Sequence, residues 1–336
     1  MKIAIHHTPN SQSFSGRWVD YCKKNNIDYK IVNAYDTDII DQVADCDAFM
    51  WHYHHNNYKD ALFAKQLLFS LQQSGKRVFP DFNTGWHFDD KVGQKYLLEA
   101  IGAPLVPSYV FYTKNEALKW VETTEFPKVF KLRGGAGATN VRLAKTKRDA
   151  NRLIKRAFGK GFSQKDFIYF FKDKCNKYRN GTSSFKDVLK AFGRIFVGNQ
   201  FAKMHAPEKG YAYFQDFIPN NLYDTRIVII GGQKAMVERR YVRQGDFRAS
   251  GSGKFEYVKA DDKMLQIAFN VARSLSLQSV AFDFIYNEKE PMIVEMSFGF
   301  GTHGIVHCGG YYTKDLEWHN EAEPDFCGWM IEDIIK

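Results

Sequence analysis

The chain has 336 residues, of which 44% are apolar, and this is enough to bury a substantial core in two or three lobes. Its apolar runs fall well short of the roughly 18 residues of a membrane span, and its five scattered cysteines lack metal-ligand spacing, so we expect free thiols in a reducing cytoplasm and no transmembrane segment. The net charge is +9, and residues 145–190 concentrate it, with 14 Lys and Arg against 4 Asp and Glu.

Residues 1–85 alternate between strand-like and helix-like runs. KIAIH, YKIVNA, CDAFMWHYHH and RVFP read as strands, and GRWVDYCKKNN and KDALFAKQLLFSLQQSG read as helices. The chain opens directly on the first of these strands, so we predict no signal peptide. This alternation predicts a small parallel sheet covered by helices. His52, His54 and His55 fall at the end of a strand, where they either help to bind a substrate or are ordinary rim residues.

The middle of the chain changes character. DDKVGQKYLLEAIGAP reads as a helix that carries Lys91, and FPKVFKLRGGAGATNVRLAK reads as two β-type runs joined by a glycine-rich turn. The basic stretch that follows, from 147 to about 205, is mostly helical. Its charge fits either a solvated helical face or a surface that attracts an anionic substrate or an acidic lipid. We do not expect a nucleic-acid partner, because no binding motif accompanies the charge.

The last third returns to strands, among them YAYFQDFI, a hairpin turned at Gly231-Gly232, VAFDFIY and PMIVEMS. GDFRASGSGKF at 245–255 looks at first like a phosphate-binding P-loop. Arg248 replaces the first glycine of that motif and Phe255 replaces its hydroxyl residue, so this interpretation fails. His303 and His307 lie in a segment too rich in glycine for a stable helix, so we do not expect them to bind a metal.

Four features favour a nucleotide site. Lys131 ends a strand just before a glycine-rich tip that lets backbone amides approach phosphates. Asp283 and Glu295 lie on consecutive, otherwise apolar strands, where two facing carboxylates need a cation such as Mg²⁺ between them. The strand end at 215–218 offers backbone to an adenine. Arg248 lies on a Gly/Ser-rich loop, where a guanidinium stabilises charge on a transferring phosphoryl group.

This order of features resembles the ATP-grasp ligases, and within them the group that contains the ribosomal-protein glutamate ligases and related peptide ligases. The strongest matches are QDFIPNNLYDTRIVIIGG, GDFRASG and FDFIYNEKEPMIVEMSFGFG, and the resemblance covers about residues 86–301. It implies an α/β protein with the ATP-grasp fold. The implied lobes are a Rossmann-like parallel-sheet lobe at 1–85, a central lobe with a basic helical insert at 86–205, and a C-terminal lobe with a substrate-enclosing tail at 206–336, the last two clasping ATP.

The resemblance also implies a role for each matching residue. Residues 134–138 would be the phosphate lid, Gln215 to Ile218 the adenine pocket and Asp224 the ribose contact. The nucleotide site would comprise Lys91, Lys131, Gly134, Gly135, Gly137, Gln215, Asp216, Phe217, Ile218 and Asp224; the catalytic arginines would be Arg226 and Arg248; and the Mg²⁺ ligands would be Asp283, Glu295 and Ser297. The family usually has asparagine at the position of Ser297 and often glutamate at that of Asp216.

The implied activity is an ATP- and Mg²⁺-dependent ligation, with Mn²⁺ as a substitute metal, in which a carboxylate becomes an acyl phosphate and an amine then displaces phosphate. The C-terminal tail is similar to ATP-grasp proteins associated with surface-polysaccharide assembly, so the small-molecule substrates would be an amine and a sugar acid, with an anionic acceptor and a peripheral membrane contact left open. Two alternatives remain: a ligase that modifies a protein or extends a peptide, and a nucleotide-binding regulator without turnover, which the departure at Ser297 suggests.

Overall fold

A computed structural model describes residues 1–135, 140–163, 184–197, 204–243 and 245–336, together with the single positions 171, 174, 175 and 178. Within these residues, every helix is too short or too polar to cross a membrane. The cysteines at 22, 46, 175, 308 and 327 form no disulfide with one another.

The N-terminal part of the chain forms a parallel sheet in the strand order β2-β1-β3-β4. The strands are β1 (Ile3–His6), β2 (Tyr29–Val32), β3 (Ala48–Met50) and β4 (Arg77–Phe79). The helices are α1 (Ser15–Lys24), α2 (Ile39–Gln42), α3 (Tyr58–Gln73) and α4 (Phe82–Gly85). The alternation of strands and helices therefore predicted this sheet correctly, although the third strand is shorter than predicted.

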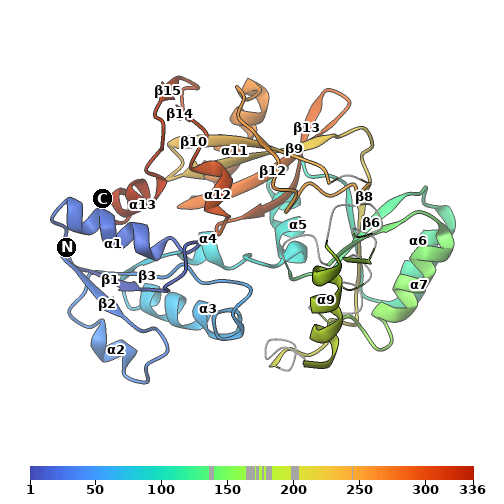
Figure 1. Ribbon diagram of the computed structural model, residues 1–336, viewed down its shortest axis with the longest axis horizontal. Coiled ribbons are helices and arrows are strands. Elements are labelled where there is room, and N and C mark those ends of the chain that lie inside the picture. Colours follow the sequence, from blue (N-terminus) through green and yellow to red (C-terminus); the bar gives the residue numbers. More distant parts are fainter. Residues whose placement is uncertain are drawn as a thin grey trace.

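A second sheet is antiparallel, in the order β5-β8-β6-β7. It comprises β5 (Ser108–Phe111), β6 (Lys128–Lys131), β7 (Val141–Ala144) and β8 (Ala212–Asp216). Helices α6 (Lys114–Thr123) and α7 (Lys147–Ala157) pack on it through a core that includes Ala117, Phe130, Ile154 and Phe214. Helix α9 (Phe185–Val197) lies between this lobe and the N-terminal lobe in the view of Figure 1.

The third sheet follows the order β13-β12-β9-β10-β14-β15, with β11 paired to β10. Its strands are β9 (Tyr223–Ile230), β10 (Lys234–Tyr241), β11 (Phe255–Glu256), β12 (Ser279–Asn287), β13 (Glu290–Ser297), β14 (Gly310–Thr313) and β15 (Trp318–Asn320). Helices α5 (Lys91–Ala100) and α11 (Asp262–Ser274) bury Leu98, Met264 and Phe269 against it. The short helix α12 (Thr302–Ile305) contacts β10.

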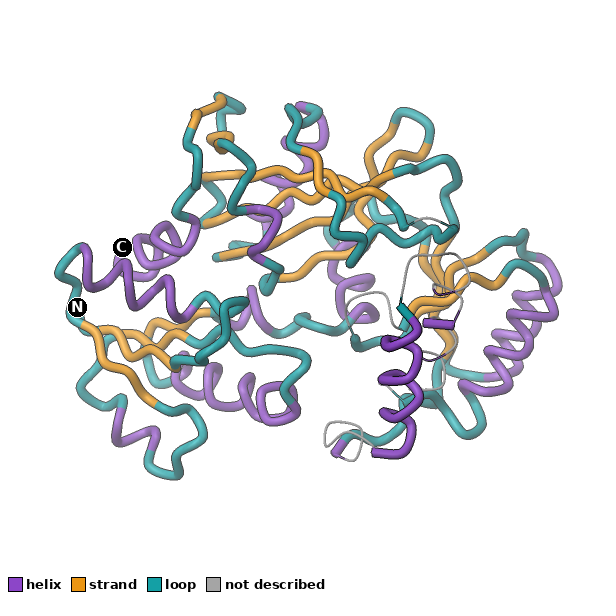
Figure 2. Tube along the Cα trace, in the orientation of Figure 1, coloured by secondary structure: helices purple, strands orange, loops and turns teal. Residues whose placement is uncertain are grey.

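The C-terminal end of the chain returns to the N-terminal lobe. Helix α13 (Phe326–Ile335) packs beside α1, and both chain ends lie at the same edge of the molecule (Figure 1). Phe326 and Ile331 share one core with Trp18 and Phe79 of the N-terminal lobe. Figure 2 shows the three sheets as separate layers, with the third sheet above the other two. The predicted lobe boundaries after residues 85 and 205 stay predictions. Strand β8 (Ala212–Asp216) follows the second boundary in sequence and belongs to the central sheet. Helix α13 (Phe326–Ile335) also follows it and packs beside α1.

Candidate active site

A cavity of about 540 Å³ opens where the three sheets meet. Every lobe contributes to its lining. The N-terminal lobe provides His52, His54 and His55; the central lobe provides Lys131, Gln215 and Asp216; and the third sheet and its loops provide Asp224, Arg226, Glu238, Arg240, Arg248, Asp283, Glu295 and Ser297. Polar and charged side chains from distant parts of the chain therefore converge on one space.

Four charged residues form a row across the third sheet. Glu295 on β13 lies opposite Asp283 on β12, Asp283 lies opposite Arg226 on β9, and Arg226 lies opposite Glu238 on β10. Directly opposite residues of antiparallel strands point to the same face. All four line the cavity, so that face of the sheet is its floor. We call these four residues the charged row.

Asp283 is the most strongly held carboxylate of the charged row. It accepts hydrogen bonds from Arg226 Nε at 2.8 Å and Arg226 Nη2 at 3.1 Å, and Arg240 Nη2 lies 2.7 Å from its Oδ2. Arg240 also donates to Asp224, with Nε–Oδ1 at 2.7 Å. Burial opposes the charge of Asp283, but the two guanidinium groups outweigh it and hold the pKa of Asp283 well below its usual value. Asp283 is therefore ionised.

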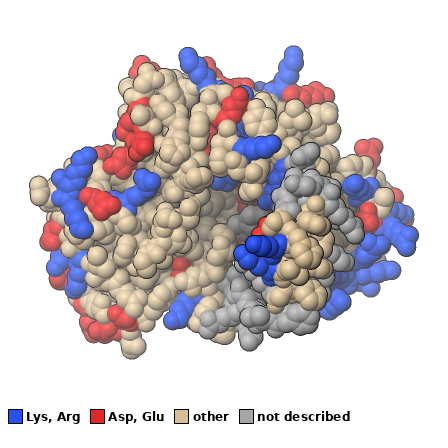
Figure 3. Space-filling model, in the orientation of Figure 1, with Lys and Arg blue, Asp and Glu red and all other residues tan. Residues whose placement is uncertain are grey.

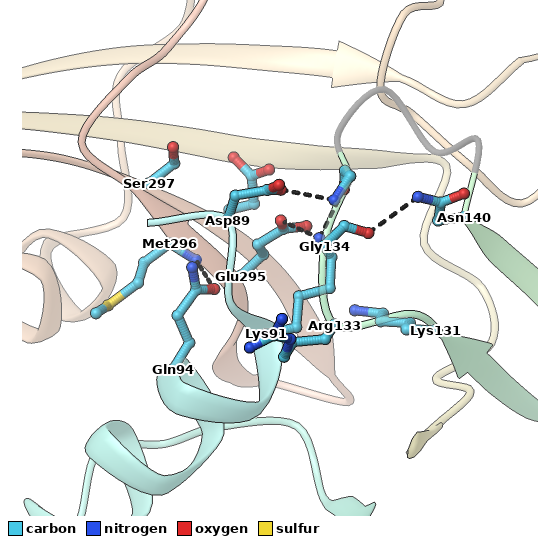
Figure 4. A network of polar contacts seen from close by, with 12 residues as sticks. Asp89, Lys91, Gln94, Lys131, Arg133, Gly134, Asn140, Glu295, Met296 and Ser297 are labelled. Carbon is cyan, nitrogen blue, oxygen red and sulfur yellow. Dashed lines mark hydrogen bonds and ion pairs between the residues drawn. The ribbon is translucent and has the colours of Figure 1, made fainter. Parts of the chain in front are cut away.

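Lys91 links the start of α5 to the charged row. The helix begins at this residue because Asp90 caps it, with Oδ1 accepting from Gly93 N at 2.9 Å. Lys91 Nζ lies 3.0 Å from Glu295 Oε1 and donates to the carbonyl oxygen of Gly135 at 2.8 Å (Figure 4). Burial lowers the pKa of Lys91, but Glu295 and Asp89 outweigh this and raise it. Lys91 is therefore a buried cation at the base of the predicted lid.

Lys131 is the second buried cation. It ends β6, is 4% exposed, and donates from Nζ to Gln215 Oε1 at 2.6 Å. Burial lowers its pKa to about 8, and the charge of Lys91 acts in the same direction. Because the Gln215 amide that accepts from this ammonium group is neutral, an anion in the cavity would stabilise its charge.

The predicted lid is described only at its base. Gly134 accepts at its carbonyl oxygen from Asn140 Nδ2 at 2.9 Å, and Gly135 N donates to Asp89 Oδ1 at 2.6 Å (Figure 4). Gly135 has φ +98°, and a Cβ there would lie 2.0 Å from Asn140 Nδ2, so this position requires glycine. Gly137, the third glycine of the prediction, lies outside the described residues.

The predicted adenine and ribose residues also reach the cavity. Gln215, Asp216, Phe217 and Ile218 follow one another along its wall, and Asp216 pairs with Lys128 at 2.5 Å. Both carboxylate oxygens of Asp224 accept from Arg240. The roles of these residues toward adenine and ribose stay predictions.

Arg248 and Ser297 both line the cavity. Arg248 follows β10 and donates from Nε and Nη2 to Asp246, at 2.8 and 2.5 Å from Oδ2. Ser297 lies two residues beyond Glu295 on β13, opposite Ala281, and its hydroxyl donates to the carbonyl oxygen of Gly299 at 2.7 Å. The described part of the chain holds no cluster of three or more His, Cys, Asp or Glu suited to a metal. The roles of Asp283, Glu295 and Ser297 toward Mg²⁺ stay predictions.

Three residues of the site were not predicted from the sequence: Arg240, Glu238 and Asp89. The sequence does contain a signal for Glu238 and Arg240. The turn at Gly231-Gly232 fixes the register of β9 and β10, which places Glu238 opposite Arg226 and Arg240 opposite Asp224. The pKa of Asp89 is raised to about 6 by burial. Its sequence position, just before α5, gave no sign that it reaches Gly135.

The N-terminal histidines close one end of the cavity. His52 is 3% exposed, stacks on Phe14 and accepts a hydrogen bond at Nδ1 from Phe14 N. Burial lowers the pKa of His52 and of His54, so both are neutral near pH 7. They line the cavity together with His55, whereas the sequence left open whether they were rim residues.

Comparison with known proteins gives a consistent result. Residues 202–311 match the family described as the RimK-like ATP-grasp domain. A ribosomal protein bS6–L-glutamate ligase of Escherichia fergusonii is 26% identical over 111 residues, which are 31% of this chain and 36% of that protein. The match thus spans about a third of the length of this curated relative.

Solved structures extend the likeness to the whole chain. A RimK-domain ATP-grasp protein from Sphaerobacter thermophilus aligns over 100% of both chains, with a TM-score of 0.57 and 12% identity. D-alanine–D-alanine ligase from Bacillus anthracis, solved as a complex with ATP, aligns over 91% of this chain and 89% of that one, with a TM-score of 0.54 and 12% identity. At these identities the likeness establishes the fold.

Proposed function

We propose that this chain, which has the ATP-grasp fold and carries a RimK-like ATP-grasp domain, is an ATP- and Mg²⁺-dependent ligase that joins a carboxylate to an amine and releases ADP. The observation that carries the proposal is the charged row. It sets two carboxylates, Glu295 and Asp283, next to the arginines that would face a reacting phosphate and carboxylate.

The nucleotide would occupy the part of the cavity lined by the two buried lysines. Lys131 and Lys91, which both line this part of the cavity, would contact its phosphates. Binding of an anion there is favourable because burial disfavours the charged form of Lys131, and a nearby negative charge stabilises it.

The residues present fit Mg²⁺. Asp283 and Glu295 lie on neighbouring strands, directly opposite each other, and both line the cavity. Magnesium in nucleotide sites typically takes one or two carboxylates together with phosphate oxygens. When bound, it would neutralise charge on the transferring phosphoryl group. Ser297 would add a hydroxyl ligand or leave that position to water.

The reaction would proceed in two steps. A carboxylate oxygen of the acid substrate attacks the γ-phosphorus of ATP, which gives an acyl phosphate and ADP, and an amine then displaces phosphate to form an amide. Arg226, Arg240 and Arg248 would hold the negative charge of the acid and of the phosphoryl group. The pKa of Arg240 is raised by Asp283 and Asp224 despite burial, so this guanidinium stays charged throughout.

The substrates form a narrower proposal. An acidic acceptor such as a sugar acid, in surface-polysaccharide synthesis, is supported by the basic stretch at 145–190. Its helix α7 carries five Lys and Arg against one Asp, and Lys and Arg side chains gather at the edge of the molecule where α7 lies (Figures 1 and 3). The second candidate is an amino-acid ligase that acts on a protein or peptide, because the relative from Escherichia fergusonii is named for its action on a ribosomal protein.

A screen of carboxylate and amine pairs, in which ADP and phosphate are followed, tests the proposal. We expect both products to appear in equal amounts and only when acid and amine are present together. Pyrophosphate formed in step with product would refute γ-phosphoryl transfer. Tight ATP binding without ADP release in any mixture would instead favour a regulator. Labelled amino acid recovered in a macromolecule would favour the second candidate.

A further inference from the structure

Glu238 is a buried acid that the nucleotide chemistry leaves unused. It is 1% exposed, lines the cavity, and has no hydrogen-bond partner at Oε2. A buried carboxylate oxygen without a partner carries a free-energy cost, so such a group indicates a missing ligand. Glu238 lies at one end of the charged row, next to Arg226, and this position indicates the charge of the ligand.

The order of charges in the row separates two kinds of ligand. Glu295 and Asp283 stand at one end, Arg226 stands next, and Glu238 stands at the other end. Neighbouring strands are about 4.8 Å apart, so Glu238 lies roughly 10 Å from Asp283. An anionic phosphate or acid near the arginines would be repelled by Glu238. A cationic group beyond the arginines would be attracted to it.

Glu238 Oε2 is packed against Gly304, at one end of the cavity. A Cβ on Gly304 would lie 2.1 Å from Glu238 Oε2 and 2.7 Å from a ring carbon of Phe255, so this position requires glycine. Tyr257 holds the same turn by donating from its hydroxyl to the carbonyl oxygen of Gly304 at 2.8 Å. Phe255, His303 and Gly304 line the cavity beside Glu238. The cavity therefore has aromatic side chains in its wall beside Glu238.

We infer that Glu238 binds the primary ammonium group of the amine substrate and accepts its proton before the amine attacks. This inference rests on the proposed ligase function and names the subsite of its second substrate. Burial raises the pKa of Glu238, which makes it a better proton acceptor than an exposed carboxylate.

The step is balanced. The ammonium gives one proton to the Glu238 carboxylate, and the nitrogen lone pair then attacks the acyl carbon. A C–N bond forms, the C–O bond to phosphate breaks, and hydrogen phosphate leaves with the second nitrogen proton. The products are the amide, hydrogen phosphate and protonated Glu238, which returns its proton to solvent when the product leaves.

A binding experiment tests this without knowledge of the natural substrate. The protein is mixed with Mg²⁺ and a non-hydrolysable ATP analogue, propylammonium chloride is added as the probe, and saturation-transfer NMR detects the bound probe. We expect a signal in the wild type and at least a fivefold smaller one in Glu238→Gln. Glu256→Gln on β11 removes the same charge beside β10 and should keep the wild-type signal. Propanol, which has no charge, should behave identically with all three proteins.

The outcomes separate the two proposals. If the wild type does not bind the ATP analogue, the ligase proposal fails, and the comparison of propylammonium signals still tests Glu238. An equal probe signal in Glu238→Gln and wild type, or none in the wild type, overturns the inference. Gly304→Ala, which displaces Oε2 while keeping the carboxylate, should lose the signal as Glu238→Gln does, and thermal melting checks that both variants are folded.

A reacting pair from the screen allows a kinetic version. Glu238→Gln should raise KM for the amine at least tenfold. Hydroxylamine, which is neutral at pH 7, can replace the amine by attacking the acyl phosphate, and the acid-dependent release of ADP in its presence should stay within twofold of wild type. An equal loss with both nucleophiles would contradict a role toward the ammonium group.

Discussion

Asp283 and Arg226 lie directly opposite each other on β12 and β9, and their side chains form a two-point contact, with Nε–Oδ1 at 2.8 Å and Nη2–Oδ2 at 3.1 Å. Arg240, which is 5% exposed, contacts the same carboxylate. A proposed magnesium ligand is thus also the centre of a buried ion network. Its substitution should affect stability as well as turnover.

We predict that Asp283→Asn lowers the free energy of unfolding by about 3 kcal/mol, because removal of one partner leaves buried guanidinium charge uncompensated. It should also abolish ADP release. Glu290→Gln is the control. Glu290 lies on the neighbouring strand β13 and forms an exposed ion pair with Lys263 of α11, so its loss should cost less than about 1 kcal/mol. Urea unfolding of the three proteins measures both effects. A loss for Asp283→Asn no larger than for the control would show that the network contributes nothing to stability.

We predict that Asp89 makes the protein less stable as the pH rises. Its pKa is about 6 in the folded protein, because burial favours the neutral form. The folded state therefore binds more protons than the unfolded state between pH 4 and 6, and stability falls across this window by about 2–3 kcal/mol. The charged groups that act on Asp89 are Lys91, Glu295 and Glu208.

The matched variant for this prediction is Asp89→Asn, whose amide oxygen can still accept from Gly135 N. Its free energy of unfolding should equal that of the wild type near pH 4 and exceed it at pH 7. Urea unfolding at half-unit pH steps measures the difference between the two curves. Parallel curves would mean that Asp89 has an ordinary pKa.

Local patterns predicted the parts of this site that lie close together in the sequence. Asp283 and Glu295 are joined by a short turn, and their pairing across β12 and β13 follows from that turn. Lys131 was found because a glycine-rich turn follows it. Both signals depend on a few neighbouring residues, which is the range over which strand and turn preferences act.

The parts that sequence patterns did not predict depend on distant contacts. Asp89 meets Gly135 across a gap of 46 residues, and His52 reaches the cavity only because the N-terminal sheet packs beside β13 and its following loop. Arg240 and Glu238 are an intermediate case. To predict these two residues, one must derive from the hairpin register which residues of β9 and β10 lie opposite each other. The alternation along β10 alone does not show which face of the sheet is the floor of the cavity.

We predict that Ser297 contributes little to metal binding. Its hydroxyl donates to the carbonyl oxygen of Gly299, and water can replace a hydroxyl on an ion that keeps several waters. Ser297→Ala should therefore lose only about 1 kcal/mol of stability and keep its magnesium dependence. Ser297→Asn, opposite the small Ala281, should lower the magnesium concentration for half-maximal rate. A magnesium titration of the three proteins decides, and a large loss of rate in Ser297→Ala with folding intact would show that the hydroxyl is required.

We predict that ATP binds more weakly as the pH rises through 8. Lys131 has a pKa of about 8 in the free protein, so its side chain is mostly the neutral amine at pH 9. Phosphates favour the charged form, and binding must then include uptake of a proton. Affinity should fall roughly tenfold between pH 7.5 and 9, since a shift of one pKa unit corresponds to about a factor of ten. Calorimetry at pH 9 in two buffers of different ionisation enthalpy should detect about one proton taken up.

Lys131→Met isolates this effect. It should bind ATP weakly at every pH and take up no proton, because no titrating group remains at the end of β6. Lys119→Met, on the exposed side of α6, should retain the wild-type pH dependence and proton uptake. If Lys131→Met still lost affinity between pH 7.5 and 9, another group would carry the titration, and Lys91 would not be that group because Glu295 and Asp89 raise its pKa.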